Sequence, residues 1–226
     1  MFIDFSKAFD SPFHDKIWST LATQGVQTEI IALLDEIYKN CTAQIRLDQL
    51  GRQFKIERGV RQGDPLSPNI FNAVLEQAFR KLDWKGRGME IKSRGGDLFE
   101  YVRLNNLRFA DDVVVIAKSG KELESMVGDL AKACAEMGLT INKDKTMILS
   151  NIENLGNIRI EGEPIAVVEQ CKYLGQILSF KDKSSKELKI RRTNAWKAFW
   201  AKKALWKSKM KLSLKLRFLK VLYYRC

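Results

Sequence analysis

The ten residues LRFADDVVVI, at 107–116, place two adjacent aspartates, Asp111 and Asp112, inside an otherwise apolar segment. Two carboxylates about 4 Å apart repel each other by roughly 4 kcal/mol at an effective dielectric constant near 20, so a buried strand does not keep both ionised without a counter-charge. A turn open to solvent is the ordinary structural explanation, and a bound divalent cation is the functional one. The pair therefore predicts a hairpin with the two acids near its turn.

A second acid in similar surroundings, Asp4 in the segment FIDFSKAFD, favours the functional explanation. Oxygen ligands suit Mg²⁺ or Mn²⁺, which proteins hold through one or two carboxylates together with substrate phosphates. Two such ions can clamp the attacking and leaving oxygens of a phosphoryl transfer. The acids therefore indicate nucleotidyl transfer, provided that Asp4 converges with the later pair in space.

Composition argues against several other kinds of site. His14 is the only histidine, which makes histidine-based metal sites and Ser-His-Asp hydrolysis poor explanations. Cys41, Cys134, Cys171 and Cys226 are scattered without a C-x-x-C pair, so we expect reduced thiols and a nuclear or cytoplasmic location. No segment approaches the roughly 20 apolar residues of a membrane helix, and the N-terminus lacks the pattern of a signal peptide. We therefore expect no membrane partner, and the sequence leaves the oligomeric state open.

The net charge of +12 comes from the C-terminal part of the chain. Residues 181–226 contain 16 Lys and Arg against 2 Asp and Glu, whereas residues 1–180 contain 23 against 25. The basic segment also holds Trp196, Trp200 and Trp206. A solvated helix packed through its tryptophans, a contact with nucleic-acid phosphates and adsorption to an acidic membrane are the alternatives. We favour packing combined with phosphate contact.

Hydrophobic spacing predicts an α+β fold in which helices cover one face of an antiparallel sheet. Ser67 is the expected N-cap of one helix, with Pro68 at the first helical position. The predicted helices are 14–25, 27–40, 68–83 and 120–139, the last closed by Gly138. The predicted strands are 1–5, 42–48, 52–59, 145–150, 157–165 and 172–180, together with a hairpin within 100–119.

Five segments resemble motifs A to E of reverse transcriptases, in the order and with the spacings of that family. They are FIDFSKAFD, RGVRQGDPLSPNIFNAVLE, FADD, GLTINKDKTMILS and YLGQIL, and they look most like those of non-LTR (LINE-type) retrotransposons. The resemblance implies a polymerase palm with partial fingers over residues 1–180 and the basic helical start of a thumb over residues 181–226. It also implies a fragment that lacks the N-terminal fingers segment preceding motif A.

By this resemblance, Asp4 of motif A would hold two Mg²⁺ ions together with Asp111 and Asp112 of motif C, and Mn²⁺ is an alternative. The main-chain carbonyl of Phe5 would be a further ligand. Phe9 matches the steric gate of the family, a ring beneath the sugar that leaves no room for a 2′-hydroxyl, which implies deoxynucleotide substrates. The ordinary alternative for Phe9 is a core aromatic residue.

The segment RQGDPLSP resembles motif B, which contacts the incoming nucleotide. Gln62 would touch this nucleotide or its template partner, Gly63 would let the backbone approach the substrate, and Arg61 would add positive charge. A turn that leads into a capped helix is the structural alternative. Asp64 departs from the small residue that many relatives carry, and the resemblance leaves the role of Asp10 open.

Two later motifs carry further implied roles. Lys145 matches the motif D lysine that protonates the departing pyrophosphate, a role that suits a lysine close to a developing phosphate charge. Lys143 is the competing residue for it. Tyr173, Leu174 and Gly175 match the primer grip of motif E, for which a plain β-hairpin is the alternative.

The resemblance thus implies an RNA-directed DNA polymerase that adds deoxynucleotides to a primer 3′-hydroxyl. Its partners would be an RNA template, a DNA primer and dNTPs. A catalytically inactive remnant that still binds nucleic acid is an alternative of another class. A protein similar to group II intron maturases is a third, and a structured intron would be its partner.

Overall fold

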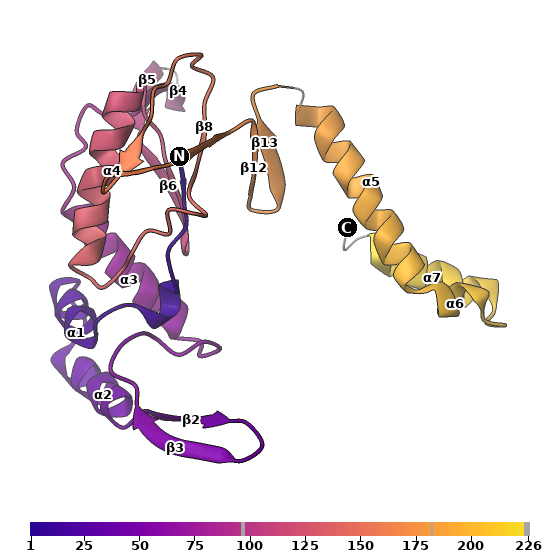
Figure 1. Cartoon of the computed structure of the whole chain (residues 1–226), viewed down its shortest axis with the longest axis horizontal. Coiled ribbons are helices and arrows are strands. Elements are labelled where there is room, and N and C mark those ends of the chain that lie inside the picture. Colours follow the sequence, from indigo (N-terminus) through magenta and orange to yellow (C-terminus); the bar gives the residue numbers. More distant parts are fainter. Residues whose placement is uncertain (96–97, 182, 224–226) are drawn as a thin grey trace. The chain divides into compact units, whose positions relative to one another are not determined.

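The computed structural model describes residues 1–95, 98–181 and 183–223 and divides the chain into two compact units, Met1–Val167 and Val168–Cys226. The first unit contains the two aspartate segments and helices α1 to α4. The second contains one β-hairpin and helices α5 to α7 (Figure 1). A functional boundary at residue 180 stays a prediction.

A five-stranded sheet with the order β11-β8-β1-β7-β6 supports the aspartates. Its central strand β1 pairs antiparallel with β7 through Phe2 and Val114, and with β8 through Phe2 and Met147. The antiparallel pairing agrees with the predicted fold class. The strands are β1 (Phe2–Ile3), β6 (Asn106–Phe109), β7 (Asp112–Val115), β8 (Met147–Leu149) and β11 (Ala166–Val168).

The described residues of the first unit contain four α-helices: α1 (His14–Thr23), α2 (Thr28–Lys39), α3 (Ser67–Arg80) and α4 (Gly120–Ala135). Helix α4 begins where Ser119 accepts a hydrogen bond from the amide of Glu122, and it buries residues at helical spacing, such as Leu123, Val127 and Leu130. These side chains form one core with residues of β7 and α3. Figure 1 shows α3 and α4 beside the sheet, as the sequence predicts.

Three two-stranded hairpins extend from this unit, and the strand pairing in one of them differs from the prediction. Strand β5 (Leu98–Leu104) pairs with β4 (Met89–Gly95), a strand that the sequence did not predict, and not with the aspartate strand. The other hairpins are β2 (Thr42–Arg46) with β3 (Leu50–Lys55) and β9 (Arg159–Ile160) with β10 (Glu163–Pro164). The β2–β3 turn precedes Gly51, which lies inside β3.

Helix α3 begins differently from the prediction. Leu66 is its N-cap and Ser67 is its first residue, so Pro68 lies one position further in. The Ser67 side chain is buried, and its hydroxyl has no hydrogen-bond partner in the part of the chain that the structure describes. Ser67 therefore contributes packing here and does not act as a cap.

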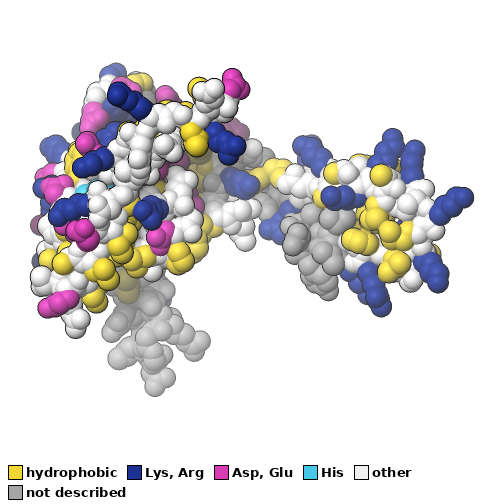
Figure 2. Space-filling view, turned by 90° about the horizontal axis from the view of Figure 1, so that it is seen from below, with side chains coloured by type: hydrophobic (Ala, Val, Ile, Leu, Met, Phe, Trp, Pro, Cys, Tyr) yellow, Lys and Arg dark blue, Asp and Glu magenta, His cyan; other side chains and the backbone are white. Residues whose placement is uncertain are grey.

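The second unit combines a short hairpin with basic helices. Strands β12 (Gln170–Tyr173) and β13 (Gln176–Ser179) precede α5 (Lys183–Ala201), α6 (Lys203–Lys207) and α7 (Leu212–Tyr223). Trp206 stacks on Phe199 with ring centroids 4.7 Å apart, and its indole nitrogen donates to the Phe199 carbonyl at 2.5 Å. Figure 2 shows lysine and arginine side chains around these helices, with hydrophobic side chains between them.

The sequence predicts reduced cysteines and no segment that spans a membrane. Cys41, Cys134 and Cys171 are free and buried, and burial raises the pKa of the Cys134 thiol to about 12. The Cys134 thiol therefore packs as a small apolar group and reacts poorly. In the described ranges, none of the helices is both long and apolar enough to cross a bilayer.

Candidate active site

The aspartate pair lies at the tip of the β6–β7 hairpin, which confirms the predicted turn. Phe109 pairs with Asp112, so Ala110 and Asp111 form a two-residue loop. Ala110 has a φ of 53°, the left-handed conformation that such tight hairpin loops require. A residue other than glycine costs about 1 kcal/mol in this conformation. The fold thus accepts local strain where it presents the acids.

The strand register brings Asp4 to the same edge of the sheet. Ile3 pairs with Val113, so the residues next in line are Asp4 at the end of β1 and Asp112 at the start of β7. Burial raises the pKa of the Asp112 carboxyl, and the charges of Asp111 and Asp4 raise it further. The three carboxylates are therefore close enough to interact electrostatically.

The carboxylate of Asp4 is incompletely satisfied. Its Oδ2 atom is buried and has no hydrogen-bond partner in the described part of the protein. The Lys145 ammonium lies 3.8 Å from this oxygen. Buried carboxylate oxygens normally have a hydrogen bond or a metal ion as partner, so this atom indicates a ligand position.

The carboxylate oxygens at this edge are donors of the kind that a divalent cation prefers, although the acids do not form a complete set of ligands. Across residues 1–95, 98–181 and 183–223, no three Asp, Glu, His or Cys side chains gather tightly enough to hold a metal ion. Ligation by Asp4, Asp111 and Asp112, with the Phe5 carbonyl, stays a prediction.

The two candidate lysines of motif D have different partners. The Lys143 ammonium lies 3.0 Å from the carboxylates of both Glu161 and Glu163, and these ion pairs raise its pKa. Lys145 is 70% exposed and has Asp4 as its acidic neighbour. The geometry therefore favours Lys145 over Lys143 as a lysine available to a substrate beside Asp4.

Motifs A and B are joined by several hydrogen bonds. The amide of Val60 donates to the Phe9 carbonyl at 2.6 Å, and the Gln62 side chain donates to Asp10 at 3.2 Å. Gly59 has a φ of 86°, and a Cβ there would lie 2.7 Å from the Asp10 backbone. Asp10 thus positions Gln62, a contact that the sequence left open.

The ring of Phe9 is held by the core. It stacks on Phe71 of α3 with centroids 4.9 Å apart and planes 18° from parallel. This contact is what a core aromatic residue makes, and it would also fix a steric gate. The structure is compatible with both explanations of Phe9.

The motif B loop borders a pocket of about 560 Å³, lined mainly by apolar side chains between α2, β3 and η1 (Ala8–Asp10). The Arg61 guanidinium donates to the Cys41 sulfur at 2.6 Å, so it faces this pocket. Gly63 has a φ of 90° with open space around it, so its backbone conformation explains the glycine. Asp64 accepts a hydrogen bond from the Leu66 amide at 2.8 Å and forms the turn that starts α3.

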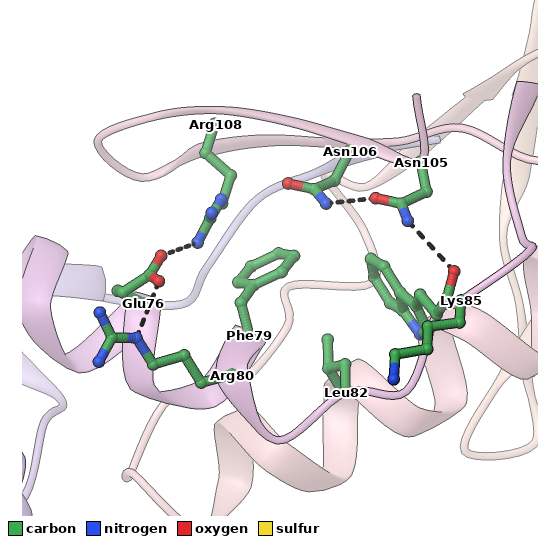
Figure 3. Close-up of a pocket in the computed structure, with 9 residues that line it drawn as sticks. Glu76, Phe79, Arg80, Leu82, Lys85, Asn105, Asn106 and Arg108 are labelled. Atoms are coloured by element: carbon green, nitrogen blue, oxygen red, sulfur yellow. Dashed lines mark hydrogen bonds and ion pairs between the residues drawn. The ribbon is translucent and has the colours of Figure 1, made fainter. Parts of the chain in front are cut away.

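The aspartate hairpin is braced against α3 on the side of Arg108 (Figure 3). The Arg108 guanidinium lies 2.6 Å from Glu76, which also contacts Arg80 at 3.0 Å, and it covers the Phe79 ring at 4.4 Å. Burial alone would raise the pKa of Glu76, but the hydrogen bonds from the two arginines outweigh it and lower the pKa. The adjoining pocket measures about 310 Å³. Three of the charged side chains that line it, Glu76, Arg80 and Arg108, pair with one another, and these contacts join β6 to α3.

The motif E residues form the predicted hairpin in the second unit. Tyr173 pairs with Gln176, and Leu174 and Gly175 form its loop with φ values of 47° and 81°. Two positive φ values match the loop type that suits the twist of paired strands. The hairpin is confirmed, and contact with a primer stays a prediction.

Sequence reasoning missed two residues that hold Asp4 in place. The Asn142 amide donates to the Asp4 carbonyl at 2.8 Å, and the Asp4 amide donates to the Thr146 hydroxyl at 3.3 Å. In the sequence, Thr146 shows only as a threonine next to Lys145, which does not identify a distant partner.

Comparison with known proteins supports the resemblance to reverse transcriptases. Residues 1–178 match the family described as reverse transcriptase (RNA-dependent DNA polymerase). The chain is 30% identical over 196 residues to the Pol polyprotein of the type-2 retrotransposable element R2DM of Drosophila melanogaster, covering 86% of this chain and 16% of that protein. It is 29% identical over 189 residues to the R2 element Pol polyprotein of Nasonia vitripennis, covering 77% of this chain and 18% of the relative.

A solved structure supports the fold. Apo telomerase of Candida tropicalis, truncated from its C-terminal domain, has a TM-score of 0.52 and 15% identity, covering 79% of this chain and 33% of that one. At this identity the likeness concerns the fold alone. The chain spans less than a fifth of the length of the two R2 relatives.

Proposed function

The chain belongs to the reverse transcriptase family, and on this premise we propose that it contributes the palm of an RNA-directed DNA polymerase of retrotransposon origin. It would add deoxynucleotides from dNTPs to the 3′-hydroxyl of a DNA primer along an RNA template. The observation that carries the proposal is the meeting of Asp4 and the Asp111–Asp112 turn at one sheet edge, with an unsatisfied carboxylate oxygen on Asp4.

Asp4 and Asp111, with help from Asp112 and the Phe5 carbonyl, would hold two Mg²⁺ ions, and Mn²⁺ suits the same oxygen donors. The chemistry supplied there is neutralisation of phosphate charge and polarisation of the phosphoryl group. The family requires divalent cations in general, which agrees with the excess of negative charge at this edge. The repulsion that raises the pKa of Asp112 would be relieved on binding.

In the reaction, the primer 3′-hydroxyl would lose its proton to solvent water, its oxygen would form a bond to the α-phosphorus of the dNTP, and the bond from that phosphorus to pyrophosphate would break. Lys145 beside Asp4 would donate a proton to the leaving pyrophosphate. Asp10 would hold the Gln62 amide toward the nucleotide or its template partner. Phe9, fixed by Phe71, would exclude a 2′-hydroxyl. Arg61, Gly63 and the hairpin of Tyr173, Leu174 and Gly175 would complete the substrate contacts.

Primer extension on an RNA template with Mg²⁺ and dNTPs tests the proposal. We expect Asp111→Asn to lower the extension rate by about 10²-fold or more, because it removes a charge required at the reacting phosphate. Asp15→Asn is the matched control, since Asp15 is an exposed acid on α1 that lies outside the five motif segments. Salt-sensitive nucleic-acid binding without extension by the unaltered chain would establish the inactive remnant instead.

A further inference from the structure

A loop of residues 140–146 runs beside the motif A segment and is hydrogen-bonded to it on both sides of Asp4. The Ser6 amide donates to the Thr140 carbonyl at 2.9 Å, and the Asn142 amide donates to the Asp4 carbonyl at 2.8 Å. The Asp4 amide donates to the Thr146 hydroxyl at 3.3 Å. Both backbone polar groups of Asp4 are thus satisfied by this one loop.

Thr146 differs from the other buried hydroxyl residues of the described chain. Thr20, Ser67 and Thr146 are each at least 98% buried. The hydroxyls of Thr20 and Ser67 have no hydrogen-bond partner among the described residues, whereas that of Thr146 accepts from Asp4. A buried hydroxyl that is paired stabilises one local geometry, and here that geometry belongs to a candidate metal ligand.

The same loop also holds Lys145. Asn142 accepts hydrogen bonds from the Lys145 amide through its side chain at 3.2 Å and from the Thr146 amide through its carbonyl at 2.9 Å. The ion pairs of Lys143 with Glu161 and Glu163 tie the outer side of the loop to the β9–β10 hairpin. The position of the Lys145 ammonium relative to Asp4 therefore depends on this closed turn.

We infer that Thr146 is a positioning residue, which fixes the motif A carboxylate of Asp4 and the motif D ammonium of Lys145 in one geometry. The effect of Thr146 on catalysis rests on the proposed function. A displacement of about 1 Å in a catalytic group can cost about 10²-fold in rate, so one hydrogen bond at this junction affects turnover more than stability.

Three variants of the full chain test the inference. Thr146→Val removes the hydroxyl while keeping the branched shape, Thr146→Ser restores it, and Thr20→Val removes a buried hydroxyl that has no partner. We expect Thr146→Val to lower kcat about tenfold or more with the KM for dNTP within about twofold, because positioning acts on the reaction step. Thr146→Ser should recover kcat to within about threefold, and Thr20→Val should leave it unchanged.

Two measurements do not depend on polymerase activity. Hydrogen exchange of the Asp4 amide, followed by NMR, should accelerate in Thr146→Val and return toward the original rate in Thr146→Ser. Titration with Mn²⁺ alone should show weaker binding to Thr146→Val than to Thr20→Val. An unchanged kcat, or an Asp4 amide equally protected in Thr146→Val, would overturn the inference. If the unaltered chain does not extend primers, the proposed function fails. The hydrogen exchange of the Asp4 amide and the affinity for Mn²⁺ would then still decide the role of Thr146.

Discussion

Asp112 lies at the start of β7, where burial and the charges of Asp111 and Asp4 raise the pKa of its carboxyl. A raised carboxyl pKa means that the folded state disfavours the ionised form. At neutral pH the ionised Asp112 therefore lowers the free energy of unfolding. Such a cost to stability agrees with the proposed role of Asp112 in metal binding, since functional sites often reduce the stability of the fold.

We expect Asp112→Asn to raise the free energy of unfolding at pH 7, because the amide keeps the shape and removes the repulsion. The residue is exposed although its carboxyl is partly desolvated, so solvent screening limits the gain to about 0.5 kcal/mol, or about 1–2 °C in Tm. Thermal unfolding without divalent cations measures it. Asp15→Asn removes an exposed acid from the first turn of α1, where negative charge favours the helix, and should not raise Tm. A Tm for Asp112→Asn at or below that of the original chain would contradict the explanation.

Among whole elements, the β6–β7 hairpin depends on contacts with α3 as well as on its own pairing. Glu76 of α3 accepts hydrogen bonds from both Arg108 of β6 and Arg80, and these lower its pKa below the ordinary value of 4.5. A carboxyl with a lowered folded pKa stabilises the fold above its unfolded pKa. This contribution disappears as the pH falls through the folded pKa.

We expect Glu76→Gln to lower the free energy of unfolding at pH 7 by about 0.5–1 kcal/mol, a modest value because the side chain is 37% exposed. The difference from the original chain should shrink as the pH drops below 4.5 and toward the folded pKa. Urea unfolding at pH 7 and near pH 3 measures both values. Glu136→Gln removes a single exposed pair with Lys81 and should cost less at pH 7. A pH-independent cost for Glu76→Gln would show that shape, and not charge, supports the hairpin.

The sequence predicted elements whose patterns are local and missed contacts between distant segments. Helix α4 was evident because Gly138 and the spacing of Leu123, Val127 and Leu130 are properties of one segment. Strand β4 was missed because its hairpin with β5 exposes side chains such as Met89 and Tyr101, so no buried face imposes alternation.

The same distinction holds within the site. Asp4, Asp111 and Asp112 were found because acids in apolar strands are anomalous, and the register that joins them follows from pairing of β1 with β7. The hydrogen bonds of Asp10 with Gln62 and of Thr146 with Asp4 join residues 52 and 142 positions apart. Ordinary polar residues carry no local sign of such partners.

At the scale of the whole molecule, the two units differ in charge and surface. The first holds the acids, while the second carries basic helices on which Trp196 and Trp200 are more than half exposed. In the described side chains of α5, Lys189, Arg192 and Lys197 form no ion pair with a carboxylate. Unpaired basic groups with exposed aromatic rings suit contact with a phosphate backbone and with bases.

The three basic residues of α5 are expected to contact the phosphate backbone of a bound nucleic acid. We expect replacement of Lys189, Arg192 and Lys197 by Gln to weaken binding to an RNA–DNA primer-template. The slope of log affinity against log salt concentration should fall in magnitude by about 2 to 3. Each phosphate contact releases counterions when the complex forms, so a variant with fewer contacts releases fewer of them. Fluorescence anisotropy over a salt series measures the slope. The control replaces three exposed lysines of the first unit by Gln and changes the net charge equally; they are Lys118, Lys121 and Lys132. If both triple variants reduce the slope alike, net charge governs binding and the second unit holds no specific phosphate contact.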